Sequence, residues 1–352
     1  MGKIEDVIKS IEPLDEEATR SATQRQDQLT KPRSSLGVLE DISIKVAGIT
    51  KNPLPKTDRK VIITMAADHG VTEEGVSAYP KEVTAQMVYN FLSGGAGINV
   101  LARAVGARIV VVDIGVAIEL DESPDLIKRK IGYGTDNMAK GPSMNREDAI
   151  KSIITGMELF EAEFDKGCDI VGTGDMGIGN TTASSAIASV ITGVDVRKVT
   201  GKGTGIDDDA LDAKVKIIEE AMGINRPDRK DPIDVLSKVG GFEIGGLAGV
   251  ILAASAKRVP VVIDGFISGA AALIATELAP LSKDYIIAAH SSVEIGHKVM
   301  LDHMGLSPIL DLNLRLGEGT GAALAMGIVE ASTRILCEMA TFSEAGVSDK
   351  IE

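Results

Sequence analysis

The chain has 352 residues, of which 44% are apolar and 25% charged, a composition typical of a globular protein with a sizeable core. Its net charge of −14 and its aromatic content of 3%, without Trp, argue against nucleic-acid binding, because no basic surface or stacking platform is available. Two isolated cysteines, Cys168 and Cys337, and a charged first ten residues predict a cytoplasmic protein without a disulfide framework or signal peptide.

Short β-branched runs alternate with longer helical segments along the chain. The runs predicted as strands are continuously apolar, which is typical of strands covered on both faces. They are Val61–Ala66, Arg108–Val112, Asp169–Val171, Val259–Ile263 and Tyr285–Ala289. The predicted helices are Glu82–Ala104, Arg146–Phe164, Asn180–Ile191, Ala210–Met222, Ile244–Ala256 and Gly269–Leu278. This alternation predicts an α/β fold, a parallel sheet with helices on both faces.

The two ends of the chain have a different character. Leu14–Leu29 is polar and helix-like without a neighbouring strand, and Thr320–Phe342 is a long helical segment, so the ends can pack together as a small helical subdomain. Gly134–Asn145 is the clearest long loop. The most apolar stretches are too short to span a bilayer, so no membrane association is expected.

Glycine-rich turns follow nearly every predicted strand, where parallel sheets bind their ligands. Gly172–Gly177 fits the dinucleotide pattern G-x-G-x-x-G, which also requires an acidic residue at the end of the next strand. Asp195 has the spacing, but its surroundings do not form a recognisable strand. We therefore prefer a phosphate cradle formed by Gly177–Thr182 at a helix N-terminus, while a nicotinamide-dependent dehydrogenase remains the alternative.

A second glycine turn, Gly201–Gly205, is followed by the acidic run Asp207–Asp209. This run could bind Mg²⁺, but capping of the following helix is the preferred interpretation. Lys214 lies inside that helix, close enough to the turn to reach a phosphate.

Glu318 lies between two glycines and opens an apolar helix. A carboxylate that only caps a helix does not need glycine on both sides, whereas glycine lets a ligand approach the backbone, so a functional role is favoured. The four histidines have no metal-ligand spacing, and we expect those that follow strands to be structural. They are His69, His290, His297 and His303.

Several motifs in a fixed order make the chain similar to a known family. Over nearly its whole length it resembles the nicotinate-nucleotide–dimethylbenzimidazole phosphoribosyltransferases of cobalamin lower-ligand assembly. The matching blocks are Lys31–Gly37, Ala67–Gly75, Pro80–Thr84, Gly174–Thr182, Asp234–Phe242, Asp264–Phe266 and Leu314–Gly319.

The resemblance implies a Rossmann-like parallel sheet in a large domain, residues 28–294, and a small helical domain formed by residues 1–27 and 295–352. It implies a homodimer that transfers phosphoribose from nicotinate mononucleotide to 5,6-dimethylbenzimidazole or a related base. The products are α-ribazole 5′-phosphate and nicotinate, with inversion at C1′. No cofactor or metal is expected, because no pyrophosphate leaves.

The resemblance also assigns roles to residues. Glu318 is the implied catalytic base. The implied phosphate and ribose contacts are Asp175, Gly177, Asn180, Thr181, Gly203, Lys214 and Ser292. The implied base pocket contains Tyr79, Met87, Met176 and Leu316. Asp175 replaces a Glu of the familiar pattern, and Tyr79 and Met87 replace a Ser and a Gln, so the identity of the accepted base is left open.

The reaction is chemically consistent with one carboxylate. Nicotinate leaves from a pyridinium and is neutral at its ring nitrogen, so no general acid is needed. A carboxylate that accepts the N–H of the benzimidazole makes its other nitrogen more nucleophilic, an effect of about 10²–10⁴-fold. Positioning of the two rings supplies much of the remaining acceleration. A non-catalytic sensor of phosphoribosyl ligands is the second alternative.

Overall fold

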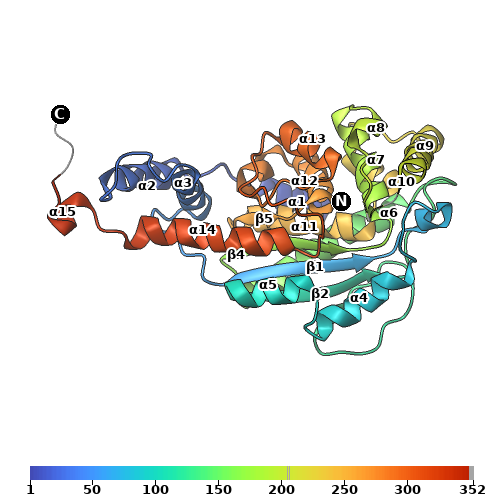
Figure 1. The fold of residues 1–352 in the computed structure, drawn as a ribbon, viewed down its shortest axis with the longest axis horizontal. Helices are drawn as coiled ribbons and strands as arrows, with labels where there is room; N and C mark the ends of the chain where they lie inside the picture. The colour runs from blue at the N-terminus through green and yellow to red at the C-terminus, as the bar shows by residue number, and fades with distance from the viewer. Residues whose placement is uncertain (204, 206, 349–352) are drawn as a thin grey trace.

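A six-stranded parallel sheet lies between two layers of helices in the computed structural model, which describes residues 1–203, 205 and 207–348 (Figure 1). The strand order is β3-β2-β1-β4-β5-β6. The strands are β1 (Lys60–Ala67), β2 (Ala107–Gly115), β3 (Leu126–Lys128), β4 (Ile170–Met176), β5 (Val261–Ile263) and β6 (Ile286–Ala288). The expected α/β fold is confirmed, and its order is that of a doubly wound Rossmann sheet, whose ligand crevice lies where the winding reverses, between β1 and β4.

The helices cover both faces of this sheet. They are α1 (Gly2–Lys9), α2 (Glu16–Gln28), α3 (Val38–Thr50), α4 (Glu82–Leu92), α5 (Gly97–Val105), α6 (Arg146–Asp165), α7 (Asn180–Thr192), α8 (Val196–Val199), α9 (Asp208–Asn225), α10 (Pro232–Val239), α11 (Phe242–Ala256), α12 (Phe266–Leu278), α13 (Ile295–Met304), α14 (Thr320–Glu338) and α15 (Phe342–Ala345), with 3₁₀ turns at Gly70–Glu74 and Pro280–Tyr285. Ile63 and Met65 of β1 pack with α6, α11 and α12, whereas Ile62 and Ala66 pack with α4, α5 and α14.

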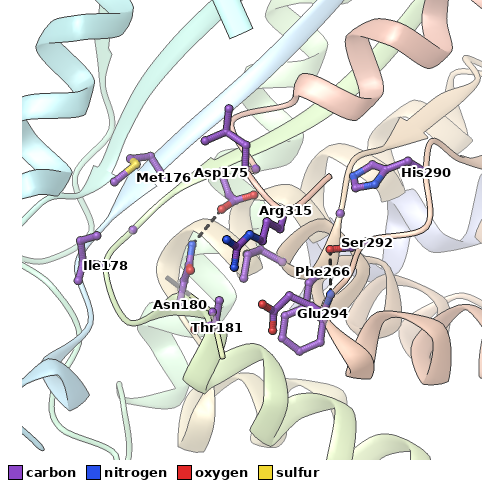
Figure 2. A pocket seen from close by; sticks show the side chains of 16 residues that line it. Asp175, Met176, Ile178, Asn180, Thr181, Phe266, His290, Ser292, Glu294 and Arg315 are labelled. Atoms are coloured by element: carbon purple, nitrogen blue, oxygen red, sulfur yellow. Dashed lines mark hydrogen bonds between the residues drawn. The ribbon is translucent and has the colours of Figure 1, made fainter. Parts of the chain in front are cut away.

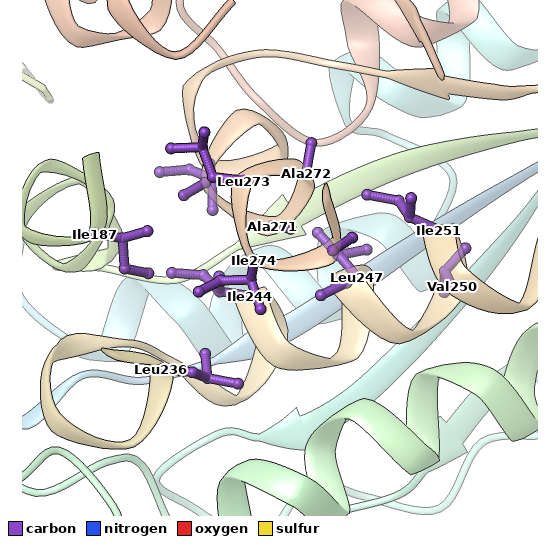
Figure 3. Packing of buried hydrophobic residues seen from close by; sticks show 14 of the residues in the cluster. Ile187, Leu236, Ile244, Leu247, Val250, Ile251, Ala271, Ala272, Leu273 and Ile274 are labelled. Atoms are coloured by element: carbon purple, nitrogen blue, oxygen red, sulfur yellow. The ribbon is translucent and has the colours of Figure 1, made fainter. Parts of the chain in front are cut away.

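Small residues allow close helix packing in a core that has few aromatic rings. Aliphatic side chains of α11 and α12, such as Leu247 and Leu273, interdigitate (Figure 3). On its other side α11 crosses α6 so closely that a Cβ atom on Gly156 or Gly249 would overlap the backbone of the opposite helix. The apolar but aromatic-poor composition is therefore accommodated by tight backbone contact instead of by large rings.

Helices from the two ends of the chain, α2 and α14, meet at one side of the molecule, although the N-terminus itself does not lie there. Figure 1 shows α2, α3 and α15 beyond the edge of the sheet, with α14 running from there onto the sheet. The guanidinium of Arg25 donates hydrogen bonds to the carbonyl oxygens of Leu336, Cys337 and Met339. However, α1 packs on α6 and α11, and α13 packs on α7 and α12. The boundaries of the small domain stay a prediction, and its residues 349–352 lie outside the described part.

Three expectations for individual elements were wrong. The segment predicted as one helix, Glu82–Ala104, is α4 and α5, separated at Ser93–Ala96, where Gly94 has φ +75°. The short edge strand β3 was not predicted, because three residues carry too little pattern.

Among the described residues, no helix is long and apolar enough to cross a membrane.

The third difference concerns the glycine fingerprint. Gly172 and Gly174 are inside β4 and do not form a turn. A Cβ atom on Gly172 would meet Met326 of α14, and one on Gly174 would overlap the main chain of Glu318. These glycines therefore let α14 and the Glu318 turn lie against the strand. Asp195, the acidic residue that the dinucleotide interpretation required, instead caps α8 by accepting the Arg197 amide at 2.9 Å.

Candidate active site

A cavity of about 140 Å³ opens beyond the carboxyl ends of β4, β5 and β6, beside the point where the sheet reverses (Figure 2). It is lined by most of the predicted site residues. Those from the predicted phosphate, ribose and base contacts are Asp175, Met176, Gly177, Asn180, Thr181, Gly203, Ser292 and Leu316. The structure therefore brings together segments that are more than a hundred residues apart in the sequence.

Glu318 lies directly behind the cavity wall formed by Leu316 and Gly317. Its φ of 64° is in the left-handed region, as are those of Gly317 and Gly319, so this short turn holds a non-glycine residue in a costly conformation. Two main-chain contacts fix the turn: the Glu318 amide donates to the Asp175 carbonyl oxygen at 3.2 Å, and the Thr64 hydroxyl donates to the Glu318 carbonyl oxygen at 3.0 Å.

The carboxylate of Glu318 faces the start of α5. It is 4% exposed, and its Oε2 accepts the Ile98 amide at 3.0 Å. Burial raises the pKa of Glu318, although the Ile98 amide opposes this shift. A carboxylate of raised pKa near the helix N-terminus is a stronger proton acceptor than one in water, as a general base requires.

Asp264 holds the other side of the Glu318 turn. One of its oxygens accepts the amides of Gly321 and Ala322 at 2.6 and 3.1 Å, and the other accepts the Gly319 amide at 3.3 Å. Asp264 thus caps α14 from a distant strand end. Burial raises the pKa of Asp264 to about 6, opposed by the nearby His290. Sequence reasoning missed this role, because local capping patterns do not detect a cap supplied from another strand.

Asp175 connects the Glu318 turn to the start of α7. Its side chain accepts a hydrogen bond from the Asn180 amide group at 2.9 Å, and its main chain bonds the Glu318 amide. Burial, together with the carboxylates of Asp264 and Glu243, holds the pKa of Asp175 well above its usual range. A protonated Asp175 can donate a hydrogen bond to a sugar hydroxyl.

Groups suited to binding an anion lie at the opposite end of the cavity. Lys214 of α9 is 1% exposed, and its ammonium group donates to the Thr181 hydroxyl at 2.8 Å. Burial lowers the pKa of Lys214 to about 8, opposed by Glu294. The Lys214 ammonium lies behind the N-terminal turn of α7, whose positive dipole end also favours an anion. Thr204 of the second glycine turn lies outside the described residues.

Some predicted residues lie elsewhere. Tyr79 is 54% exposed, and Met87 packs on the α4 side of the sheet, so neither lines the cavity. Conversely, Phe266, Glu294 and Arg315 line it without having been assigned a role. For Arg315 a signal was present, since it is a lone cation beside the glycine-flanked Glu318.

The acidic run after the second glycine turn caps a helix, as preferred. Asp207 accepts the Ala210 amide at 2.9 Å, and Asp208 pairs with Lys202 at 2.7 Å. No cluster of His, Cys, Asp or Glu suited to a metal ion occurs among residues 1–203, 205 and 207–348. His69 is a buried structural residue that bonds Glu243 at 2.7 Å.

Residues 11–347 match a family model described as phosphoribosyltransferase. The chain belongs to this phosphoribosyltransferase family. Relatives named nicotinate-nucleotide–dimethylbenzimidazole phosphoribosyltransferase are 59% identical in Desulforudis audaxviator, over 97% of both chains, and 57% identical in Roseiflexus sp., over 100% of both. The crystal structure of the protein of that name from Thermus thermophilus is 43% identical, covers 96% of this chain and 100% of its own, and superimposes with a TM-score of 0.91. The resemblance predicted from the motifs is confirmed, and this member of the family is an enzyme of pentosyl transfer.

Proposed function

We propose that this family member transfers the phosphoribosyl group of nicotinate mononucleotide to 5,6-dimethylbenzimidazole, or to a related flat base, in cobalamin biosynthesis. The observation that carries the proposal is the distribution of charge along one cavity. A buried ammonium and a helix N-terminus lie at one end, and a buried carboxylate of raised pKa lies behind the other. A nucleotide presents its phosphate and its reacting C1′ atom at opposite ends in the same way.

In this proposal the phosphate binds Lys214, Thr181 and the amides of Gly177 and Gly203, and Ser292 completes the ring of donors. Asp175 and Asn180, joined by their hydrogen bond, face the ribose. C1′ then lies toward Leu316 and Gly317, next to Glu318.

Glu318 accepts the N–H proton of the incoming base while the other ring nitrogen forms the bond to C1′. The C1′–N bond to the pyridinium breaks, and nicotinate keeps the electron pair and leaves neutral at its ring nitrogen. Attack on the face opposite the leaving ring converts the β anomer to the α anomer. Met176 and Leu316 supply an apolar wall for the base, and Tyr79 and Met87 are proposed to extend it. A cytoplasmic homodimer is also proposed, on the strength of the resemblance.

A panel of bases tests the proposal. The protein is incubated with nicotinate mononucleotide and, in turn, dimethylbenzimidazole, benzimidazole and adenine, and the products are identified by mass spectrometry. We expect α-ribazole 5′-phosphate and an equal amount of nicotinate. Saturable binding without nicotinate release would favour a sensor, and stabilisation by NAD but not by the mononucleotide would favour a dehydrogenase.

A further inference from the structure

A second buried carboxylate, that of Glu294, lies in the proposed phosphate site. Glu294 lines the cavity together with Thr181, Gly203 and Ser292, and it is only 7% exposed. It occupies the N-cap position of α13, yet within the described residues its side chain does not cap that helix. Figure 2 shows its carboxyl group directed toward Thr181, the residue that bonds Lys214.

The charges around Glu294 show what this carboxylate does in the empty site. It is the one group that opposes the effect of burial on the pKa of Lys214. In return, Lys214, the Gly203 amide and Arg315 oppose the rise that burial causes in the pKa of Glu294. The other titratable groups that line the cavity are Asp175, His290 and Arg315. His297 lies beside His290, with 6.0 Å between the ring centroids, and burial lowers its pKa to about 3, which keeps it neutral.

The carboxylate of Glu294 is tightly packed by its surroundings. Its Oε2 atom is buried without a hydrogen-bond partner among the described residues, and a Cβ atom on Gly201 would overlap it. A buried carboxylate oxygen without a partner is costly, so the Oε2 atom depends on the electrostatic effect of the neighbouring Lys214 ammonium.

A substrate phosphate would compete with Glu294 for the same donors. The donors proposed for the phosphate include the Lys214 ammonium and the Gly203 amide, which also face Glu294. Two anions around one buried ammonium repel each other, and protonation of one of them removes the repulsion.

We infer that Glu294 is a place-holder for the substrate phosphate, which neutralises Lys214 in the empty site and takes up one proton from solvent when the phosphate binds. The inference rests on the proposed function, because it places the phosphate of nicotinate mononucleotide beside Lys214. The proton converts the carboxylate to a neutral carboxyl group, and no other bond forms or breaks.

Titration calorimetry of the full chain with nicotinate mononucleotide, without a base acceptor, tests this inference. At pH 8 the free phosphate is already a dianion, since its second pKa is about 6. The heat is measured in buffers of different ionisation enthalpy, with inorganic phosphate omitted, so that the dependence gives the number of protons taken up. The wild type is compared with Glu294→Gln, which keeps the size of the side chain, and with Glu277→Gln, which removes a carboxylate from outside the cavity.

Lys214, whose pKa is about 8 in the empty site, also takes up part of a proton when the phosphate binds, both in the wild type and in Glu294→Gln. We expect the wild type and Glu277→Gln to take up more protons than Glu294→Gln, by up to one. The Kd of the wild type should then rise more steeply with pH around pH 8 than that of Glu294→Gln. Nicotinate riboside, which lacks the phosphate, should bind without this uptake, and this comparison keeps the test available if Glu294→Gln does not fold.

Equal proton numbers for the wild type and Glu294→Gln, or equal uptake with the riboside and the mononucleotide, would overturn the inference and leave the proposed function intact. Absence of any saturable binding of the mononucleotide by the wild type would instead contradict the proposed function itself.

Discussion

Gly174→Ala tests whether the glycines of β4 are needed to let the Glu318 turn pack against the strand. In the wild-type structure a Cβ atom at this position would lie 2.8 Å from both the Thr64 hydroxyl and the Glu318 carbonyl carbon, whereas ordinary contact begins at 3.4 Å. Two of the three nearest atoms, the carbonyl carbon and oxygen of Glu318, belong to the backbone, so the overlap cannot be relieved by turning a flexible side chain. The strand or the Glu318 turn has to move by several tenths of an ångström.

Two effects follow from this movement. Overpacking of a buried site should lower the free energy of unfolding by about 1–3 kcal/mol. A displaced base should reduce turnover by up to ~10²-fold, the loss expected for a misplacement near 1 Å. Of the two residues that meet the new methyl group, Glu318 is proposed to act on the substrate through its side chain and Thr64 is not.

The assays are thermal unfolding and the initial rate of nicotinate release. Gly223→Ala is the matched control, because Gly223 is in helix α9 with nothing within 4 Å of its added Cβ atom. That change should raise stability by about 0.5–1 kcal/mol without affecting turnover. A Gly174→Ala protein as stable and active as the wild type would refute the explanation of why β4 is glycine-rich.

Four further outcomes are expected. Glu318→Gln should keep its KM for nicotinate mononucleotide but lose turnover by ~10²-fold or more in initial-rate assays, and near-normal turnover would remove Glu318 from the mechanism. Lys214→Met should raise that KM by roughly 10–100-fold, because a charge-assisted contact of about 1.5–3 kcal/mol is lost. The pKa of Lys214 is about 8 in the folded protein, below its usual 10.5, so between these pH values the unfolded chain binds more protons than the folded one. The free energy of unfolding of the wild type should therefore rise with pH through this window. Lys214→Met should lack this rise in chemical denaturation, and an identical pH dependence of the two proteins would contradict the prediction. Burial raises the pKa of the Cys168 thiol to about 12, so Cys168 should resist alkylation at pH 8 until the protein unfolds, and rapid labelling of native protein in mass spectrometry would contradict this.

Much of the fold could be predicted because its signals are local. The strands β1, β2, β5 and β6 are continuous apolar runs, and α9 begins at a capping aspartate, Asp207, which a single sequence reveals. The end of α4 was missed although Gly94 and Gly95 are a local turn signal, because the apolar residues on both sides of Ser93–Ala96 continue the helical pattern.

The errors at the site have a common cause, which is long-range packing. Gly172 and Gly174 resemble a turn in the sequence. In the structure, their lack of a side chain lets α14 and the Glu318 turn, about 150 residues away in the chain, pack against β4. The cap that Asp264 supplies to α14 is equally non-local. Local patterns could find Glu318 and the start of α7, but not the contacts that hold them in register.

Helix α14 connects the Glu318 turn to helix α2 at the far side of the molecule. Helix α14 has 19 residues and begins directly after Gly319. At its other end, Arg25 donates hydrogen bonds to the last carbonyl oxygens of the helix. At 1.5 Å per residue it forms a rod of about 28 Å. Because α14 is anchored at both ends, we expect a displacement of α2 or α3 to shift the Glu318 turn as well. A substitution at that distant end, such as one of Arg25, is therefore expected to affect the position of Glu318 without touching the cavity.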